Sequence, residues 1–445
     1  MAARAAFPGL LLMTFLTGCF REQTIPIEPS AVVRMERPDA ATTRQWLAAA
    51  RERLMPLLPK RHKRPLINEE LIGPGGFAVD VYRYFNTNPK TLSGIFTNFF
   101  GLLHTAQASH TTVPDRDPPP WPGFEDVWIP VADGIEIFGR LGFATRDGQP
   151  IQSDCVVILP GLLGDLSVER TRTLALALRD AGLHAIAIEL RGFGRTDARF
   201  PDVYYNFGVA ETGDLLAVAE WLQAKPEVRR TGLIGFCWGA NHALLAAWDD
   251  GRAADHPSVR PRLKPYLRPR NEQRHYEAGI IAFSPVLSFE NIIDRCENPI
   301  SAWVDPVQAS LQGGLCERKA AKGHSPCDGN LRTLISAEFE RSAIRYPGAV
   351  ADGLDYLRFL PYRDRDAGDK LESARVPVLI VQASNDPLGP AQDVAALAAT
   401  TDNPNVAFIM LEGGGHVGFA PYARDWYYSL ILNYFDRVAG AAARE

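Results

Sequence analysis

The five residues 235–239, which read GFCWG, decide the fold of this 445-residue chain. An apolar run over residues 232–236 leads into them, and an apolar stretch with helical character follows over residues 238–248. A side chain at such a strand-to-helix corner projects above the sheet only if the turn is tight and strained. The glycines two residues before and after Cys237 let strand and helix pass without a Cβ between them. The motif therefore predicts a nucleophile, Cys237, at this corner.

Short apolar runs and helical segments alternate along the chain on both sides of this corner. Strands are expected over residues 155–159, 184–190, 232–236, 279–283, 376–382 and 406–411, and helices over residues 167–181, 214–224, 238–248 and 422–435. Runs as apolar as these are typical of strands covered on both faces, and strands that alternate with helices form a mostly parallel sheet. We therefore predict an α/β fold with helices on both faces of the central sheet.

The chain divides into three predicted parts. Residues 1–19 read as a signal peptide, residues 20–123 as an N-terminal helical extension and linker, and residues 124–440 as the α/β domain. The domain opens with an antiparallel hairpin over residues 125–143. The alternation of strands and helices stops at about residues 287–370, which predicts a cap inserted late in the sheet.

Two segments of the extension carry apolar side chains at helical spacing. Residues 42–58 predict an amphipathic helix, and residues 25–37, which precede it, are expected to be a tether. Residues 91–103 are dense in Phe and Leu. Packing on the main domain is the expected arrangement for this second segment, and a surface that meets lipid or substrate is the alternative.

The N-terminus has the features of an export signal. Arg4 precedes an apolar run over residues 5–16 that is too short to span a bilayer and right for a signal-peptide core. The run ends in LTGC at residues 16–19, which resembles the bacterial lipobox. We expect an exported lipoprotein, held at the periplasmic or cell-surface side of a membrane by lipid on Cys19. Simple secretion and a cytoplasmic location are the alternatives.

Four of the six cysteines are left once the lipidated residue and the nucleophile are set aside. They are Cys155, Cys296, Cys316 and Cys327, an even set in a compartment that permits disulfides. Cys316 and Cys327 are close enough in sequence to bridge one loop. Cys155 opens an apolar run and is expected to be a buried small hydrophobe. The sequence leaves the pairing open.

Composition and charge exclude several classes of function. The chain is 46% hydrophobic and 22% charged, which is typical of a soluble globular protein with a substantial core. Its formal net charge of -5 is small for this length and argues against nucleic-acid binding. No metal or nucleotide motif is present, so neither a metal ion nor a cofactor is expected. The oligomeric state is not predicted.

Two late strands lead into polar residues that complete a catalytic set with Cys237. The strand over residues 376–382 runs into Asp386, and the strand over residues 406–411 runs into a glycine-rich loop that contains His416. The carboxyl ends of parallel strands meet at one edge of a sheet, so these three side chains are expected to come together. His416 would deprotonate Cys237, and Asp386 would orient the imidazole.

An acyl transfer through Cys237 also needs two donors for the oxyanion of its tetrahedral intermediate. The backbone N–H of Trp238, at the start of the following helix, is one candidate. The loop at residues 160–164, which reads PGLLG and follows an apolar strand, supplies the other, and Leu162 is its best candidate.

From about residue 152 to residue 435 the chain resembles the α/β-hydrolase superfamily, and within it the YheT-like branch. The resemblance rests on RGFG at residues 191–194, Asn241 after the elbow, SP at residues 284–285, DP at residues 386–387 and GGHVGF at residues 414–419. Two positions depart from that branch. Pro160 replaces the usual histidine of the oxyanion loop, and Cys237 replaces serine, as in the dienelactone hydrolases and the polyhydroxyalkanoate synthases.

The resemblance and the residues together imply a hydrolase that acts on an ester, lactone or thioester bond of a small-molecule or lipid-like substrate. The reaction would proceed through a covalent acyl-enzyme on Cys237. Two other functions remain open from the sequence. One is an acyltransferase, in which an alcohol or amine replaces water and the cap excludes water; the other is a catalytically inactive binding protein of the same fold.

Overall fold

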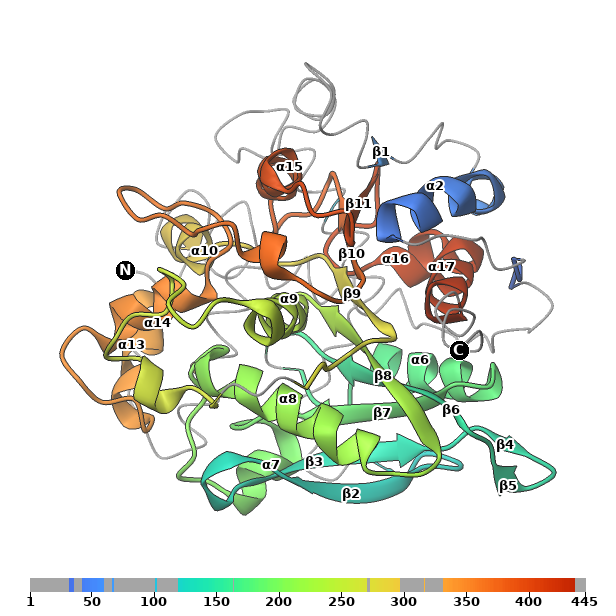
Figure 1. Cartoon of the computed structure of the whole chain (residues 1–445), viewed down its shortest axis with the longest axis horizontal. Coiled ribbons are helices and arrows are strands. Elements are labelled where there is room, and N and C mark those ends of the chain that lie inside the picture. Colours follow the sequence, from blue (N-terminus) through green and yellow to red (C-terminus); the bar gives the residue numbers. More distant parts are fainter. Residues whose placement is uncertain are drawn as a thin grey trace, which may run out of the picture.

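The computed structural model describes residues 32–35, 42–59, 66–67, 101, 119–162, 164–269, 273–296, 316 and 331–436. These residues form a nine-stranded sheet in the order β1-β11-β10-β9-β8-β6-β7-β3-β2, with a separate two-stranded hairpin of β4 and β5 (Figure 1). The six strands from β11 to β7 run parallel, and β1, β3 and β2 are antiparallel additions at the two edges. The predicted fold class is confirmed.

The strands of the main sheet are bounded as follows: β1 Leu66–Ile67, β2 Glu125–Pro130, β3 Glu136–Gly142, β6 Ser153–Leu159, β7 His184–Glu189, β8 Val228–Phe236, β9 Gly279–Phe283, β10 Val378–Ala383 and β11 Val406–Leu411. The helices that cover the sheet are α2 Thr43–Leu54, α6 Glu169–Asp180, α8 Val209–Gln223, α9 Trp238–Gly251, α15 Ala391–Thr400 and α17 Arg424–Asp436. The predicted hairpin corresponds to β2 and β3, which are joined by the short turn η4 (Ala132–Gly134).

Strand β8 begins four residues earlier than predicted, because its first residues include charged side chains that do not fit the pattern of a buried strand. Arg229 and Arg230 interrupt the apolar pattern at the start of the strand. Both guanidinium groups bind the buried carboxylate of Asp154 on β6, at 2.8 Å and 2.7 Å. Pairing with a buried acid lets two charged residues occupy strand positions.

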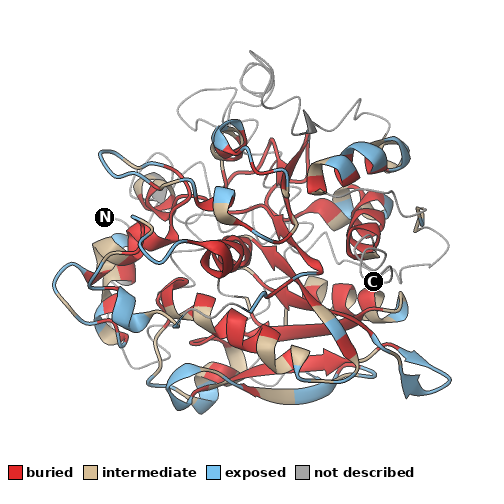
Figure 2. Ribbon diagram, viewed as in Figure 1, coloured by how far each residue is buried: buried red, intermediate tan, exposed pale blue. Residues whose placement is uncertain are grey.

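Side chains along the central strands alternate between two separate hydrophobic clusters, as the period of a strand requires. In β6, Val157 and Leu159 face one cluster, with α8, α9 and α15, whereas Val156 and Ile158 face the other, with α2, α6 and α17. Both faces of the sheet are therefore covered by helices, and Figure 2 shows the central strands as buried.

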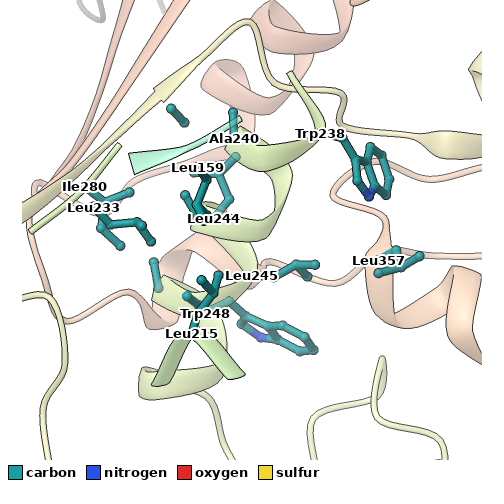
Figure 3. Close-up of a cluster of buried hydrophobic side chains, with 14 of the residues drawn as sticks. Leu159, Leu215, Leu233, Trp238, Ala240, Leu244, Leu245, Trp248, Ile280 and Leu357 are labelled. Atoms are coloured by element: carbon teal, nitrogen blue, oxygen red, sulfur yellow. The ribbon is translucent and has the colours of Figure 1, made fainter. Parts of the chain in front are cut away.

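Helix α9, which follows Cys237, is buried along its whole length. Its Leu244 lies beside the strand residue Leu159, with Leu233 and Ile280 in the same cluster, whereas Trp248 lies beside Leu215 of α8 (Figure 3). A helix buried all round has little freedom to move, so the residue at its N-terminus is held by the core.

The N-terminal extension is integrated with the catalytic domain. Helix α2 packs on β11 and α17, and Trp46 meets the ring of Tyr434 edge to face, with centroids 5.2 Å apart. Strand β1 pairs antiparallel with β11 and so adds an edge to the sheet. Residues 32–35, part of the predicted tether, are hydrogen-bonded to α17, where the Met35 N–H donates to Asn433 Oδ1 at 2.8 Å. The helix was predicted correctly, but the strand and this docked segment were not.

The predicted cap contains the helices α10 (Phe289–Cys296), α13 (Leu331–Arg341) and α14 (Ala349–Leu357), which contact one another. The start of the insertion contacts the segment after α14, where the Phe359 N–H donates to the Leu287 carbonyl at 2.8 Å. Cys316 of the insertion is disulfide-bonded, and Cys327, its proposed partner, lies outside the described residues.

Cys155 is free and buried in β6. The interpretation of this residue as a small core hydrophobe is confirmed. Of the helices that the structure describes, none is long and apolar enough to cross a membrane. The predicted signal peptide and Cys19 lie outside the described residues.

Candidate active site

Cys237 occupies the corner between β8 and α9 with φ 58° and ψ -121°, a conformation that a residue with a side chain rarely adopts. Its own N–H donates to the Phe283 carbonyl of β9 at 3.0 Å, and its carbonyl accepts from the Ala240 N–H at 3.1 Å. The strained corner is thus fixed by the neighbouring strand and by the first turn of α9. Strain of this kind at a single reactive residue is typical of functional sites.

The two glycines of the motif are required by close backbone contacts. A Cβ on Gly235 would lie 2.2 Å from the Gly239 carbonyl oxygen, and a Cβ on Gly239 would lie 2.2 Å from the Pro160 carbonyl oxygen. Both contacts are with backbone, which cannot move aside. The spacing argument from the sequence is therefore confirmed, and it extends to the loop after β6.

Asp386 lies in the loop after β10 and is fully buried. Its Oδ1 accepts hydrogen bonds from the N–H groups of Leu388 and Gly389, both at 2.8 Å, and Gln382 Nε2 donates to its Oδ2 at 3.2 Å. These donors fix the carboxylate in one orientation and stabilise its charge.

His416 lies in the glycine-rich loop after β11 and faces Asp386. Its Nδ1 is 3.0 Å from Asp386 Oδ1 and 2.9 Å from Oδ2. The loop turns through positive φ angles at Gly414, Gly415 and Val417, of 128°, 57° and 58°. Positive φ favours glycine, which accounts for Gly414 and Gly415. Val417 is held in this conformation by its N–H, which donates to Ser284 Oγ at 3.1 Å.

The thiol of Cys237 and the imidazole of His416 lie close enough that each shifts the pKa of the other. Because Nδ1 faces Asp386, Nε2 is the imidazole nitrogen left to accept the proton of the thiol. The structure therefore brings the three predicted residues Cys237, His416 and Asp386 together in that order. Cys237 is partly exposed, whereas His416 and Asp386 are buried.

Electrostatics at this site favour a thiolate beside an imidazolium. Burial raises the pKa of the Cys237 thiol, but the charge and hydrogen bond of His416 outweigh burial and hold that pKa below its ordinary value. Burial lowers the pKa of His416, but the charges of Asp386 and Cys237 outweigh it and raise that pKa. The opposite shifts mean that the proton rests on the imidazole.

Both predicted oxyanion donors point at the nucleophile. The backbone N–H groups of Trp238 and Leu162 lie near the Cys237 sulfur, and each lowers the pKa of this thiol. The loop after β6 approaches so closely that a Cβ on Gly161 would lie 2.8 Å from Cys237 Cβ. Pro160, which departs from the usual histidine, leaves this backbone arrangement intact.

The inserted segment packs against the residue that follows the nucleophile. The Trp238 and Phe289 rings lie 4.3 Å apart between centroids, and Trp238 Nε1 donates to the Phe207 carbonyl at 2.9 Å. Asn241, one turn further along α9, donates through Nδ2 to the Val286 carbonyl at 2.9 Å. The contact with Phe289 ties the insertion to the site, and the hydrogen bond to Val286, which directly precedes the insertion, gives Asn241 a structural role.

The sequence of the C-terminal two thirds matches a known family. The sequence pattern of the Alpha/beta hydrolase family matches residues 156–428, more than half of the chain. The chain belongs to this hydrolase family. The match contains the nucleophile corner, the acid loop and the histidine loop described above.

Individual relatives of the hydrolase are distant. It is 22% identical over 295 residues to embryogenesis-associated protein EMB8 of Picea glauca, an alignment that covers 64% of this chain and 59% of that protein. It is 23% identical over 306 residues to YheT of Escherichia coli strain K12, whose esterase activity is itself provisional, covering 67% and 78%. The Pyrococcus furiosus esterase Pf2001 is a structural neighbour, with 18% identity, a TM-score of 0.46 and coverage of 75% and 100%. The hydrolase spans less than two thirds of the spruce protein.

Two residues that support the site were not identified as such from the sequence. Asn385 Oδ1 accepts the Gly415 N–H at 3.0 Å and so joins the acid loop to the histidine loop. Ser284 supports the histidine loop from the end of β9. Asn385 was signalled only by its place beside Asp386, whereas Ser284, which directly follows β9, was noted only as part of the SP motif at residues 284–285.

Gly101, in the Phe- and Leu-rich segment of the extension, touches the acid loop. It is buried, and a Cβ there would lie 2.0 Å from the Asn385 carbonyl oxygen. The rest of residues 91–103 lies outside the described part of the chain, so contact with the domain is established at this one residue.

We predict that Gly101→Ala lowers kcat by about 100-fold, because it displaces Asn385 and with it the carboxylate that orients His416. Steady-state turnover of an aryl ester measures the effect. Gly213→Ala in α8 is the matched control, since its Cβ would lie 3.1 Å from the Cβ of Arg268, a milder contact that a shift of a few tenths of an ångström relieves. Wild-type kcat in Gly101→Ala would show that this contact does not hold the acid loop.

Proposed function

We propose that this hydrolase cleaves carboxylic ester-type bonds of small-molecule substrates (esters, lactones or thioesters) through a covalent acyl-cysteine intermediate. The observation that carries the proposal is the convergence of the Cys237 sulfur, the His416–Asp386 pair and two backbone amides at one sheet edge. The esterase names of YheT and Pf2001 agree with this class of substrate. The motifs quoted from the sequence support a place in the YheT-like branch.

In the acylation step, the Cys237 thiolate attacks the carbonyl carbon and a C–S bond forms. The carbonyl π electrons move to oxygen, and the Leu162 and Trp238 amides, which face the sulfur, donate to that oxyanion. When the tetrahedral intermediate collapses, the bond to the leaving group breaks. His416 Nε2–H, whose proton came from the thiol, protonates the leaving oxygen or sulfur.

In the deacylation step, His416 takes a proton from a water molecule, and the resulting hydroxide attacks the thioester carbon. The C–S bond then breaks, the carboxylic acid leaves, and the thiolate is restored beside the imidazolium. Asp386 keeps Nδ1–H in place through both steps, so that Nε2 always faces the reaction. A thiolate is a good leaving group, which makes the acyl-cysteine easy to resolve.

Turnover without an added acceptor tests hydrolysis directly. We expect the purified protein to release acid from short- and medium-chain aryl esters and thioesters in buffer alone, at a rate that added alcohols or amines do not raise. Dependence on an acceptor would instead support acyl transfer. A protein that binds these esters and never releases acid would support the inactive alternative, and either outcome contradicts the proposal.

We also propose that the protein is exported and held at a membrane by lipid on Cys19. The support is the sequence alone, in which residues 5–16 form a signal-peptide core and LTG at residues 16–18 directly precedes Cys19. The mass of the N-terminal peptide of protein purified from membranes tests this proposal. A mature chain that begins elsewhere than Cys19, or carries no acyl mass there, would contradict it.

A further inference from the structure

Glu189, the last residue of β7, places a carboxylate in the interior between two loops. Its side chain is fully buried. Oε1 accepts the Leu166 N–H at 3.1 Å, and Oε2 accepts the Arg195 N–H at 2.6 Å. One acid therefore joins the loop that follows β6 to the start of α7 (Gly194–Arg199).

The chain around Glu189 is shaped to hold this carboxylate. Gly194 has φ 48°, and a Cβ there would lie 2.3 Å from Glu189 Oε1. The Thr196 hydroxyl donates to the Glu189 carbonyl at 2.8 Å, which fixes the backbone at the same point. The last glycine of RGFG thus leaves room for a buried acid that has no partner in the proposed triad.

The loop that is hydrogen-bonded to Glu189 through Leu166 also contains Leu162, whose amide lies near the nucleophile. It leaves β6 after Leu159 and enters α6 at Glu169. Within it, the Gly164 N–H donates to the Gly161 carbonyl at 2.9 Å. The Leu166 N–H lies beyond this turn and is tied to the sheet by Glu189. The position of the Leu162 amide is therefore set by β6 on one side and by Glu189 on the other.

We propose that Glu189 is a positioning residue that holds the oxyanion-binding loop, so that the Leu162 amide donates to the acyl oxygen in the transition state. This inference rests on the proposed function, because it assigns an oxyanion to the site. Glu189 touches neither substrate nor sulfur and acts only through the loop. Loss of the hydrogen bond between Glu189 and the Leu166 N–H would lower the rate of acylation. The reactivity of the thiolate and the affinity for substrate would stay unchanged.

The charge state of Glu189 gives this role a pH signature. Burial is the main cause that raises the pKa of Glu189 to about 7; the charge of Asp165 acts in the same direction, and the two amides and the charge of Arg195 oppose it. The Arg195 guanidinium itself is directed at Asp126, 2.6 Å away. Protonation of the carboxylate removes one of its hydrogen-bond acceptors, so kcat of the wild type should fall below about pH 7. Glu189→Gln has no carboxyl group at this position, so its kcat should lack this step.

The test compares Glu189→Gln with Glu211→Gln. Glu211 is also fully buried, also has a pKa raised to about 7 by burial, and also accepts two backbone N–H groups, those of Asn206 and Gly208. Those amides belong to the start of α8 and not to the oxyanion loop. In each variant the glutamine NH2 replaces a carboxylate oxygen and faces a backbone N–H group that the oxygen had accepted. Two donors then oppose each other, so both variants are expected to lose stability to a similar degree.

We expect Glu189→Gln to lower kcat for an aryl ester by about 10- to 100-fold with little change in KM, and Glu211→Gln to keep kcat near wild type. Alkylation of Cys237 by iodoacetamide, which needs the thiolate and no oxyanion donor, should proceed at the wild-type rate in both. Glu189→Asp, which keeps the charge on a shorter side chain, should recover part of kcat.

Equal losses of kcat in the two glutamine variants, or a parallel fall in Cys237 alkylation, would overturn the inference, because either shows a general structural effect. A wild-type pH profile that Glu189→Gln reproduces would overturn it too. Failure of the proposed function is a separate result: wild-type protein would then form no acyl adduct on Cys237, whatever Glu189 does.

Discussion

Cys237→Ala should lower turnover of an aryl ester by at least about 1,000-fold, the largest effect of any single change in this protein. The sulfur is the only atom at the corner that can form the acyl bond, and the alanine methyl group cannot replace it. Two amides and His416 remain, so a residual rate above that of water is expected. Steady-state assays, with circular dichroism to confirm folding, measure the change.

Cys155→Ala is the matched control for this substitution. Cys155 is the other free cysteine that the structure describes, and it is buried in β6 away from the strand's carboxyl end. Its loss creates a small cavity at a cost of about 1 kcal/mol and leaves kcat unchanged. Cys237→Ala with wild-type turnover, or a Cys155→Ala protein that folds but is inactive, would each show that the nucleophile is elsewhere.

His416→Ala should lower turnover by about 1,000-fold and at the same time change the reactivity of the thiol. The imidazolium is the main attraction that keeps the Cys237 pKa below its ordinary value, and without it burial alone raises that pKa. The thiolate then exists only at alkaline pH. Alkylation by iodoacetamide, measured from pH 5 to pH 10, should be rapid at neutral pH in the wild type and require alkaline pH in the variant.

His256→Ala serves as the control for the histidine, because this residue lies outside the site, in contact with the Trp248 ring. It should keep both the turnover and the alkylation profile of the wild type. If His416→Ala and the wild type are alkylated with the same pH dependence, the thiol is not paired with this imidazole.

Local pattern was sufficient to predict the sheet and the three residues at its edge. Buried parallel strands are short apolar runs, and each of β6, β7, β9 and β11 was located to within two residues. The elbow glycines follow from a steric requirement that two backbone contacts of 2.2 Å confirm. Asp386 and His416 could be placed because the carboxyl ends of parallel strands share one edge.

The parts that sequence reasoning missed depend on contacts between distant segments. β1 has two residues and becomes a strand only because β11 has an open edge beside it. Gly101 meets Asn385, and Glu189 meets Leu166, through backbone groups that carry no sequence signal of their own. The helix over residues 42–58 was predictable because its apolar face and its Thr42 cap are local.

Intact-mass analysis of the protein mixed with a slowly hydrolysed ester tests the central claim most directly. We predict an adduct of one acyl group that forms and decays in the wild type, maps to the peptide containing Cys237, and is absent from Cys237→Ala. Turnover of the ester without an adduct on that peptide, or the same adduct in Cys237→Ala, would contradict the account.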